Sequence, residues 1–204
     1  MRDGIHIAPI AVLWLAWLAY WMIAARGGKP VQREEPVWSR LSYLVPLMVG
    51  ALLLAFGRAF GGWFSGRFMP HFEVIYWVGT IMVAAGIAFM VWARLHLGGN
   101  WSGRVTLKHD HELIRTGPYA LVRHPIYSGL LLGLLGTVIV FGQWVVAIAF
   151  VLIAAAIWRK SRIEERYLAE IFPDDYARYC ADVPALVPSF FRHRAAPTAN
   201  SERR

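Results

Sequence analysis

Cysteine is almost absent from this chain: Cys180 is the only one among 204 residues. A single thiol excludes an intramolecular disulfide, a CxxC redox pair and a cysteine-rich zinc cluster. Acidic residues are also few, with 13 Asp and Glu against 21 Lys and Arg, which leaves a net charge of +8. The basic residues are spread between apolar runs and near the C-terminus, without a continuous basic face. This distribution favours anionic lipid headgroups as partners over nucleic acid.

Hydrophobic residues, in contrast, make up 57% of the chain, and ten of its residues are tryptophan. This composition is far more apolar than that of soluble proteins. The apolar residues fall into about five runs: 5–25, 41–56, 74–97, 126–141 and 144–158. A helix needs about 20 residues to cross a bilayer, so the first and third runs are long enough, and the others must borrow interfacial residues. Aromatic residues at the run ends suit interfacial anchors: Tyr43, Tyr127, Trp144 and Trp158. The sequence therefore predicts an all-α integral membrane protein with about five transmembrane helices.

Positively charged residues lie on alternate sides of these runs. The first loop, the third loop and the segment after Trp158 hold nearly all of them. The positive-inside rule then places the N-terminus outside and the C-terminus in the cytoplasm, most simply in a bacterial inner membrane. This topology brings the 98–125 loop and the 159–194 segment to the cytoplasmic face, where any chemistry is expected. Residues 1–194 are predicted to form a single membrane-embedded domain, followed by a disordered polar tail at 195–204.

The segment before the fourth run combines helix breakers with reactive side chains. It reads RTGPYALVRHPIYSG from Arg115 to Gly129. Pro125 suits the first turn of a helix, and a helix N-terminus attracts carboxylate and phosphate groups. One interpretation is a cap at the membrane surface, in which Arg123 and His124 bind lipid headgroups. The other is a ligand site, because two tyrosines, an arginine and a histidine lie within nine residues.

Three stretches of the chain, in this order, resemble the isoprenylcysteine carboxyl methyltransferase family and, more loosely, the phospholipid N-methyltransferases. They are HELIRTGPYALVRHPIYSG, EERYL, and FPDDYARY leading to VPALVP. The resemblance implies an integral-membrane methyltransferase that uses S-adenosyl-L-methionine and releases S-adenosylhomocysteine. It also implies a cytosolic cofactor pocket formed by the 98–125 loop and the C-terminal segment. By motif position, the resemblance implies a cofactor shell of nine residues: His111, Tyr119, Arg123, His124, Pro125, Tyr127, Gly129, Glu164 and Glu165.

The groups of this cofactor suit these residue types. An ammonium requires an acid, a carboxylate requires a cation or a helix N-terminus, and adenine and sulfonium require aromatic faces. Glu164 or Glu165 suits the ammonium, while Arg123 and the helix start at Pro125 suit the carboxylate. The adenine or the sulfonium has three aromatic candidates: Tyr119, Tyr127 or Trp101. Because no strand followed by GxGxxG is present, the pocket must be built from helix ends and loops.

The methyl acceptor is expected to be lipid-like or prenylated, because a membrane-embedded partner explains why the enzyme lies in a bilayer. A carboxylate acceptor is already ionised at neutral pH and needs only an orienting cation, for which Arg178 and Arg192 are candidates. A phospholipid amine would need deprotonation, in which His111 or His124 could assist. Asp182 stands where the family usually has a basic run, so both acceptors stay open.

Two other functions also stay open. A membrane lipid or sterol reductase that uses NADPH shares an RHP stretch with a tyrosine, but its motif usually continues as Asn-Tyr-Phe-Gly-Glu, whereas this chain reads IYSG. A non-catalytic membrane partner would use the RHP loop only as a cap. No metal site is expected, because His109 and His111 have no third ligand nearby.

Three further patterns predict structure rather than chemistry. The GLLLG sequence at 129–133 has the GxxxG spacing that favours close packing between helices. The three residues at 141–143 leave room only for a tight helical hairpin between the fourth and fifth runs. The glutamates at 34–35 are expected to pair with Arg33 and Arg40 in a solvated loop.

Overall fold

A computed structural model describes residues 3–24, 35–98 and 113–188 of the chain. The described part is built from helices, in this order: α1 (Asp3–Ala24), α2 (Val37–Phe56), the 3-10 turns η2 (Gly57–Phe60) and η3 (Gly62–Ser65), α3 (Glu73–Leu97), η5 (Gly117–Ala120), α4 (Pro125–Phe141), α5 (Trp144–Ile171) and α6 (Pro173–Asp182). The prediction of an all-α fold is confirmed.

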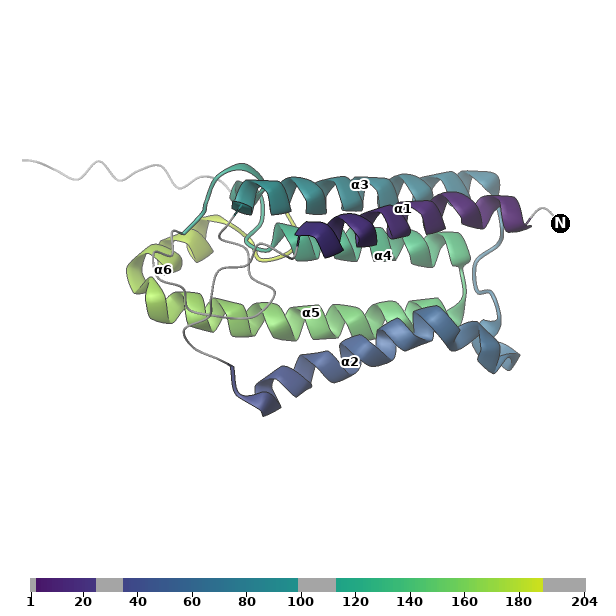
Figure 1. The fold of residues 1–204 in the computed structure, drawn as a ribbon, viewed down its shortest axis with the longest axis horizontal. Helices are drawn as coiled ribbons and strands as arrows, with labels where there is room; N and C mark the ends of the chain where they lie inside the picture. The colour runs from purple at the N-terminus through teal and green to yellow at the C-terminus, as the bar shows by residue number, and fades with distance from the viewer. Residues whose placement is uncertain (1–2, 25–34, 99–112, 189–204) are drawn as a thin grey trace, which may run out of the picture.

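The long helices α1 to α5 run along the length of the molecule, and α6 lies at one end (Figure 1). The N-terminus lies at the opposite end. Helix α3 packs against α4 and α1, and α2 packs against α5. Because successive helices alternate in direction, the end of α3, the start of α4, the end of α5 and α6 all meet at the same end. The described part of the third loop, residues 113–125, lies there beside residues 159–188, as predicted; residues 99–112 and 189–194 lie outside the described residues.

Within the described residues, three helices are long and apolar enough to cross a membrane. They are α2 extended through its 3-10 turn (Val37–Phe60), α3 and α5, and two shorter apolar helices accompany them, Ala8–Ala24 and Pro125–Phe141. The predicted boundaries differ from the helix ends by a few residues, except in α5. The apolar run stops at Trp158, but the helix continues to Ile171. It continues because the polar residues after Trp158 are good helix formers, and the next proline is Pro173.

Helices α4 and α5 form the tight hairpin that the sequence predicts. Gly142 ends α4 in the left-handed conformation, with φ of 55°, and its N–H donates to the carbonyl of Val138 at 2.7 Å. Glycine adopts this conformation without the steric cost that a Cβ would add. The carbonyl of Gly142 also accepts a 2.8 Å hydrogen bond from the N–H of Phe68, which ties the hairpin to the segment before α3.

Glycines bring the backbones of α3 and α4 into contact. A Cβ on Gly86 of α3 would lie 2.5 Å from the carbonyl oxygen of Gly129 and 2.6 Å from the nitrogen of Gly133, both in α4. One step along the same interface, a Cβ on Gly136 would lie 2.5 Å from the carbonyl oxygen of Gly79. The packing interpretation of the GLLLG pattern is confirmed, and the interface holds the start of α4 firmly against α3.

Candidate functional site

The backbone before α4 pairs with the backbone after α6. The N–H of Arg123 donates to the carbonyl of Pro184 at 2.9 Å, and the N–H of His124 donates to that of Ala185 at 3.0 Å. One turn into α4, the hydroxyl of Ser128 donates to the carbonyl of Leu186 at 2.5 Å. Pro125 occupies the first helical position, where its missing N–H costs nothing. These contacts lay the C-terminal segment along the RHP loop.

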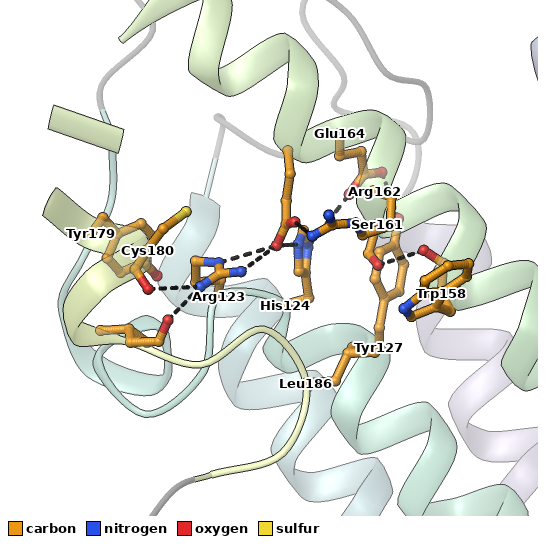
Figure 2. Close-up of polar contacts among 12 residues, drawn as sticks. Arg123, His124, Tyr127, Trp158, Ser161, Arg162, Glu164, Tyr179, Cys180 and Leu186 are labelled. Atoms are coloured by element: carbon orange, nitrogen blue, oxygen red, sulfur yellow. Dashed lines mark hydrogen bonds and ion pairs between the residues drawn. The ribbon is translucent and has the colours of Figure 1, made fainter. Parts of the chain in front are cut away.

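The Arg123 guanidinium also holds the C-terminal segment against the RHP loop. It donates to Glu165 Oε1 through Nε at 3.1 Å and Nη2 at 2.6 Å, and through Nη1 to the carbonyls of Val183 at 2.5 Å and Cys180 at 3.3 Å. Figure 2 shows Arg123 between Cys180 on one side and His124 on the other. The planar fork of arginine matches this set of acceptors. Arg123 therefore joins the loop, α5 and the end of α6.

The Glu165 carboxylate contacts three basic side chains. Besides Arg123, the ring nitrogen Nε2 of His124 lies 3.3 Å from its Oε1, and Arg162 Nη1 lies 2.9 Å from its Oε2. The Glu165 side chain is only 9% exposed. A buried carboxylate of this kind is stabilised by its cations, and here each oxygen already has one. In this structure Arg123 and Glu165 neutralise each other within the protein.

Glu164, the other member of the acidic pair, lies on the opposite side of His124. Its Oε1 accepts a 2.6 Å hydrogen bond from the hydroxyl of Tyr127, and Oε2 lies 3.6 Å from His124 Nδ1. The rings of His124 and Tyr127 are stacked, with centroids 5.6 Å apart. Lys160 Nζ lies 3.8 Å from Glu164 Oε1. Glu164 thus connects the start of α4 to the polar half of α5.

Tyr119 is buried in the short η5 turn. Its ring stacks on His96 at the end of α3, with centroids 6.3 Å apart, and its carbonyl accepts a 2.6 Å hydrogen bond from the hydroxyl of Tyr179 in α6. Burial raises the pKa of the Tyr119 hydroxyl above its usual value. Burial likewise raises the pKa of Tyr179 to about 12, although Arg123 and Arg115 oppose this effect. Both hydroxyls therefore stay protonated at physiological pH.

Two predicted site residues make their contacts away from the network of the RHP loop and Glu165. Arg178 forms a 2.8 Å ion pair with Asp175, and its side chain is 70% exposed. The pKa of Asp175 is lowered by hydrogen bonds from Arg178 and from Arg115. A Cβ on Gly129 would contact Gly86 and Met90 of α3, so this glycine faces the helix interface. The structure thus gives Arg178 and Gly129 contacts that do not involve the RHP–Glu165 network.

Several predicted residues lie outside the described residues. They are His111 of the proposed cofactor shell, the histidine His109, the aromatic candidate Trp101 and the acceptor candidate Arg192. The same holds for residues 99–112 of the 98–125 loop and for the 195–204 tail. A hollow of about 270 Å³ lies instead between α5 and α6. It is lined by Arg162, Glu165, Arg166, Ala169, Pro173, Tyr176, Ala177 and Cys180.

Three residues that the sequence did not connect with the site take part in it. Tyr43 and Glu35, from α2 and the residues before it, form a 3.0 Å hydrogen bond, and Lys160 lies over the rings of both Tyr43 and Tyr127. The prediction of a solvated Glu35 was wrong, because its side chain is buried against α2. In the sequence, Tyr43 is already explained as an interfacial anchor, and Lys160 as one of the positive charges of the segment after Trp158. Their shared contact depends on how α2 and α5 pack.

Comparison with known proteins gives consistent matches. Residues 77–170 match the model of the isoprenylcysteine carboxyl methyltransferase family, and this range includes most of α3, the RHP loop, α4 and nearly all of α5. The protein-S-isoprenylcysteine O-methyltransferase of Schizosaccharomyces pombe is 31% identical over 162 residues, which cover 72% of this chain and 67% of that protein.

Other relatives extend the comparison to plants and bacteria. Protein-S-isoprenylcysteine O-methyltransferase B of Arabidopsis thaliana is 32% identical over 130 residues, covering 59% of this chain and 64% of that protein. The cobalt-zinc-cadmium resistance protein CzcN of Cupriavidus metallidurans is 30% identical over 159 residues, covering 76% of this chain and 65% of that protein. The chain thus spans about two thirds of the length of these curated relatives.

Proposed function

Because this chain belongs to the isoprenylcysteine carboxyl methyltransferase family, we propose that it is an integral-membrane methyltransferase that transfers a methyl group from S-adenosyl-L-methionine to a lipophilic carboxylate. The observation that carries the proposal is the network of Arg123, His124, Glu164 and Glu165. It joins the RHP loop, the acidic pair and the C-terminal segment at one end of an apolar helix bundle. A membrane-entry cap alone needs only cations at a headgroup and does not require buried carboxylates.

Some residues of this network can contact such a cofactor, and others can hold the contacting residues in place. Glu164 and Tyr127 offer a carboxylate and an aromatic face at the end of the bundle, and His124 stacks beside them. We propose that these residues, with Tyr119, His111 and the helix start at Pro125, hold the cofactor. Arg123 and Glu165 then support the pocket from behind, because their charges are already mutually neutralised. When bound, the cofactor supplies a methyl group activated by a positively charged sulfur.

The protein's own task in such a reaction is positioning. A carboxylate acceptor has a pKa of about 4 and is ionised at neutral pH, so no side chain has to remove a proton. An in-line displacement then gains most from holding the acceptor at the correct distance and from excluding water. The interlocked loop and C-terminal segment supply a rigid wall for this purpose, and the lipid-facing helices admit an apolar acceptor. The acceptor is proposed to be prenylated or otherwise lipid-like.

The helix arrangement also supports the proposed topology. Alternate helix ends, with α6 and the RHP loop at one end, place the site in the cytoplasm if the N-terminus is outside. In this arrangement α1 and α4 complete about five spans together with the three longer helices. The cation-rich segment after Trp158 then lies on the cytoplasmic side of a bacterial inner membrane.

Methyl transfer can be measured directly with the full chain in detergent or nanodiscs. The purified protein is supplied with S-adenosyl-L-methionine bearing a labelled methyl group and with a farnesylated cysteine analogue. We expect a labelled product that releases methanol in alkali, as a carboxyl methyl ester does. The His124→Ala variant should lose most of this activity, whereas Glu73→Gln, at the opposite end of the bundle, should keep it. NADPH serves as the comparator ligand for the reductase alternative.

The outcomes separate the possible functions. Alkali-stable label on phosphatidylethanolamine, supplied as a second acceptor, would replace the carboxylate by an amine and keep the rest of the proposal. Saturable binding of NADPH with no binding of S-adenosylhomocysteine would favour a reductase and contradict the proposal. Binding of neither ligand would leave the RHP loop as a structural cap.

A further inference from the structure

Two tyrosines from different helices face the same ammonium group. Lys160 Nζ on α5 lies 5.7 Å from the ring centroid of Tyr43 on α2 and 5.6 Å from that of Tyr127 on α4. Both distances fall within the range of about 6 Å in which a ring face attracts a cation. A site with two such faces resembles those that recognise organic cations more than those that serve anions.

Carboxylates hold both tyrosines in place. The hydroxyl of Tyr43 donates to Glu35 Oε2 at 3.0 Å, and the hydroxyl of Tyr127 donates to Glu164 Oε1 at 2.6 Å. These bonds fix the rings and bring two negative charges to the site. We call these four residues, Glu35, Tyr43, Tyr127 and Glu164, the tyrosine box. Their elements are separate in the chain and meet only in the fold.

The tyrosine box contains two carboxylates, and the single positive charge of Lys160 cannot neutralise both of them. Glu164 contacts Lys160 at 3.8 Å and His124 Nδ1 at 3.6 Å. Glu35 is only 5% exposed, and its Oε1 is buried without a hydrogen-bond donor among the described residues. Arg40 is close enough to influence Tyr43 electrostatically. A buried carboxylate oxygen without a partner is costly, and a donor or cation brought by a ligand would remove that cost.

Lys160 is suited to leave the tyrosine box. Its side chain is 21% exposed, and it lies two residues after Trp158, where the apolar part of α5 ends. A lysine carries its charge on a flexible four-carbon stem, so the ammonium can move into water while the stem stays in contact with apolar surface.

We propose that the tyrosine box is a subsite for a cationic group of the bound cofactor, and that Lys160 is a tethered cation that is displaced when this group binds. The inference rests on the proposed function, in which the cofactor brings a sulfonium and an α-ammonium to this end of the bundle. Either group is an organic cation of the class that two tyrosine faces and two carboxylates attract. The site thus extends to α2, a helix that lies outside the family match.

Calorimetric titration of the full chain in detergent tests the subsite. The two ligands are S-adenosylhomocysteine, which has only the α-ammonium, and sinefungin, which has a second amine in place of the sulfonium. Glu35→Gln and Tyr43→Leu should each weaken sinefungin about tenfold, as the loss of a desolvated cation–π or ionic contact predicts. Tyr43→Phe, which keeps the ring face, should lose less than Tyr43→Leu. The matched controls are Tyr20→Leu on α1 and Glu73→Gln at the start of α3.

The two ligands identify the cation. If only sinefungin is weakened, the group at the reacting centre occupies the tyrosine box; if both are weakened equally, the α-ammonium occupies it. Both results support the subsite. Unchanged affinity of both ligands for Glu35→Gln and Tyr43→Leu would overturn it.

Removal of the tethered cation gives a result that damage to the fold cannot imitate. The relevant ligand is the one whose affinity Glu35→Gln and Tyr43→Leu reduce. Lys160→Met should bind this ligand about threefold to tenfold more tightly than the wild type does, because a like charge no longer competes for the site. Weaker binding by Lys160→Met would contradict the displacement and would instead make Lys160 a direct ligand of an anionic group.

The subsite can also be judged separately from the proposed function. If the wild-type protein binds neither nucleoside, the proposed function fails, and tetramethylammonium becomes the probe. Its occupancy of the tyrosine box should raise the rate at which an amine-reactive reagent acylates Lys160, as followed by mass spectrometry. An unchanged rate at saturating tetramethylammonium would then overturn the subsite as well.

Discussion

Arg123 shows how a residue's chemistry can be evident while its partner is not. Its position in the RHP stretch predicts contact with a carboxylate, and in the structure the carboxylate belongs to Glu165, 42 residues along the chain. Its backbone acceptors, Cys180 and Val183, are 57 and 60 residues away. Arginine supplies a planar set of donors that binds such a group of acceptors better than a lysine ammonium does. Arg123 is therefore a positioning residue that holds the C-terminal segment against the loop.

Replacement of Arg123 should destabilise the protein more than replacement of the other arginine on Glu165. Arg123→Met leaves a buried carboxylate with less compensation, which costs about 3 kcal/mol in the free energy of unfolding. Arg162→Met removes a half-exposed partner and should cost less than about 1 kcal/mol. Arg123→Lys should fall between the two. Unfolding in mixed micelles measures these values, and equal losses for Arg123→Met and Arg162→Met would contradict the role given to Arg123.

The raised pKa of Tyr179 predicts that the contact between α6 and η5 stabilises the fold less as the pH becomes alkaline. Its pKa is about 12 in the folded protein, mainly because it is buried, whereas an unfolded tyrosine has a pKa of about 10. A group with a raised pKa contributes its full stability below the unfolded value and loses it as the pH rises through the folded value. Below pH of about 10, Tyr179→Phe should be less stable than the wild type by about 1 kcal/mol, the value of one hydrogen bond. This difference should shrink toward a pH of about 12; a constant difference would contradict the assignment.

At the scale of the elements, α3 and α4 depend on glycines that a hydrophobic pattern cannot distinguish from ordinary apolar positions. The GLLLG spacing predicts close packing of α4, but it does not name the partner helix. The structure identifies α3, through Gly86 and Gly79. Helix α5 shows the reverse case, because its apolar run ends at Trp158 while its backbone continues to Ile171. Hydrophobicity defines where the bilayer ends and helix propensity defines where the helix ends, and the two need not coincide.

Gly86→Ala should disturb the α3–α4 interface. The added Cβ would lie 2.5 Å from a backbone oxygen and 2.6 Å from a backbone nitrogen, neither of which can rotate away. We expect a loss of about 1–3 kcal/mol in the free energy of unfolding, the usual cost of overpacking. Ala85→Val adds more atoms on the exposed side of α3 and should cost less than about 0.5 kcal/mol. A neutral Gly86→Ala would show that the two helices are not held at this distance.

At the scale of the whole molecule, the alternating helices place α6 and the turns after α2 at opposite ends (Figure 1). The sequence predicts the same alternation from its positive charges. If the end with α6 is cytoplasmic, the 3-10 turns at the other end face the outside. The position of the only cysteine, Cys180 in α6, makes this easy to examine.

Thiol labelling in intact cells should distinguish the two ends. Cys180 should react with a membrane-permeant maleimide and be protected from an impermeant one. In a Cys180→Ser background, Ala59→Cys in the exposed η2 turn should react with both reagents. Lysed cells serve as the control, because there both positions should be accessible. Reaction of Cys180 with the impermeant reagent in intact cells would reverse the proposed orientation.

The sequence by itself determined the helical class, the approximate ends of the helices other than the C-terminal end of α5, and the end of the bundle where the RHP loop meets the C-terminal segment. These properties follow from hydrophobicity, charge placement and the alternation of helices, all of which are local or additive along the chain. The fold was needed to show that Arg123 binds Glu165, that Glu35 is buried, and that Lys160 lies between Tyr43 and Tyr127. Those contacts join residues far apart in the chain, so they depend on which helices pack together and at what distance, and that is decided only when the bundle assembles.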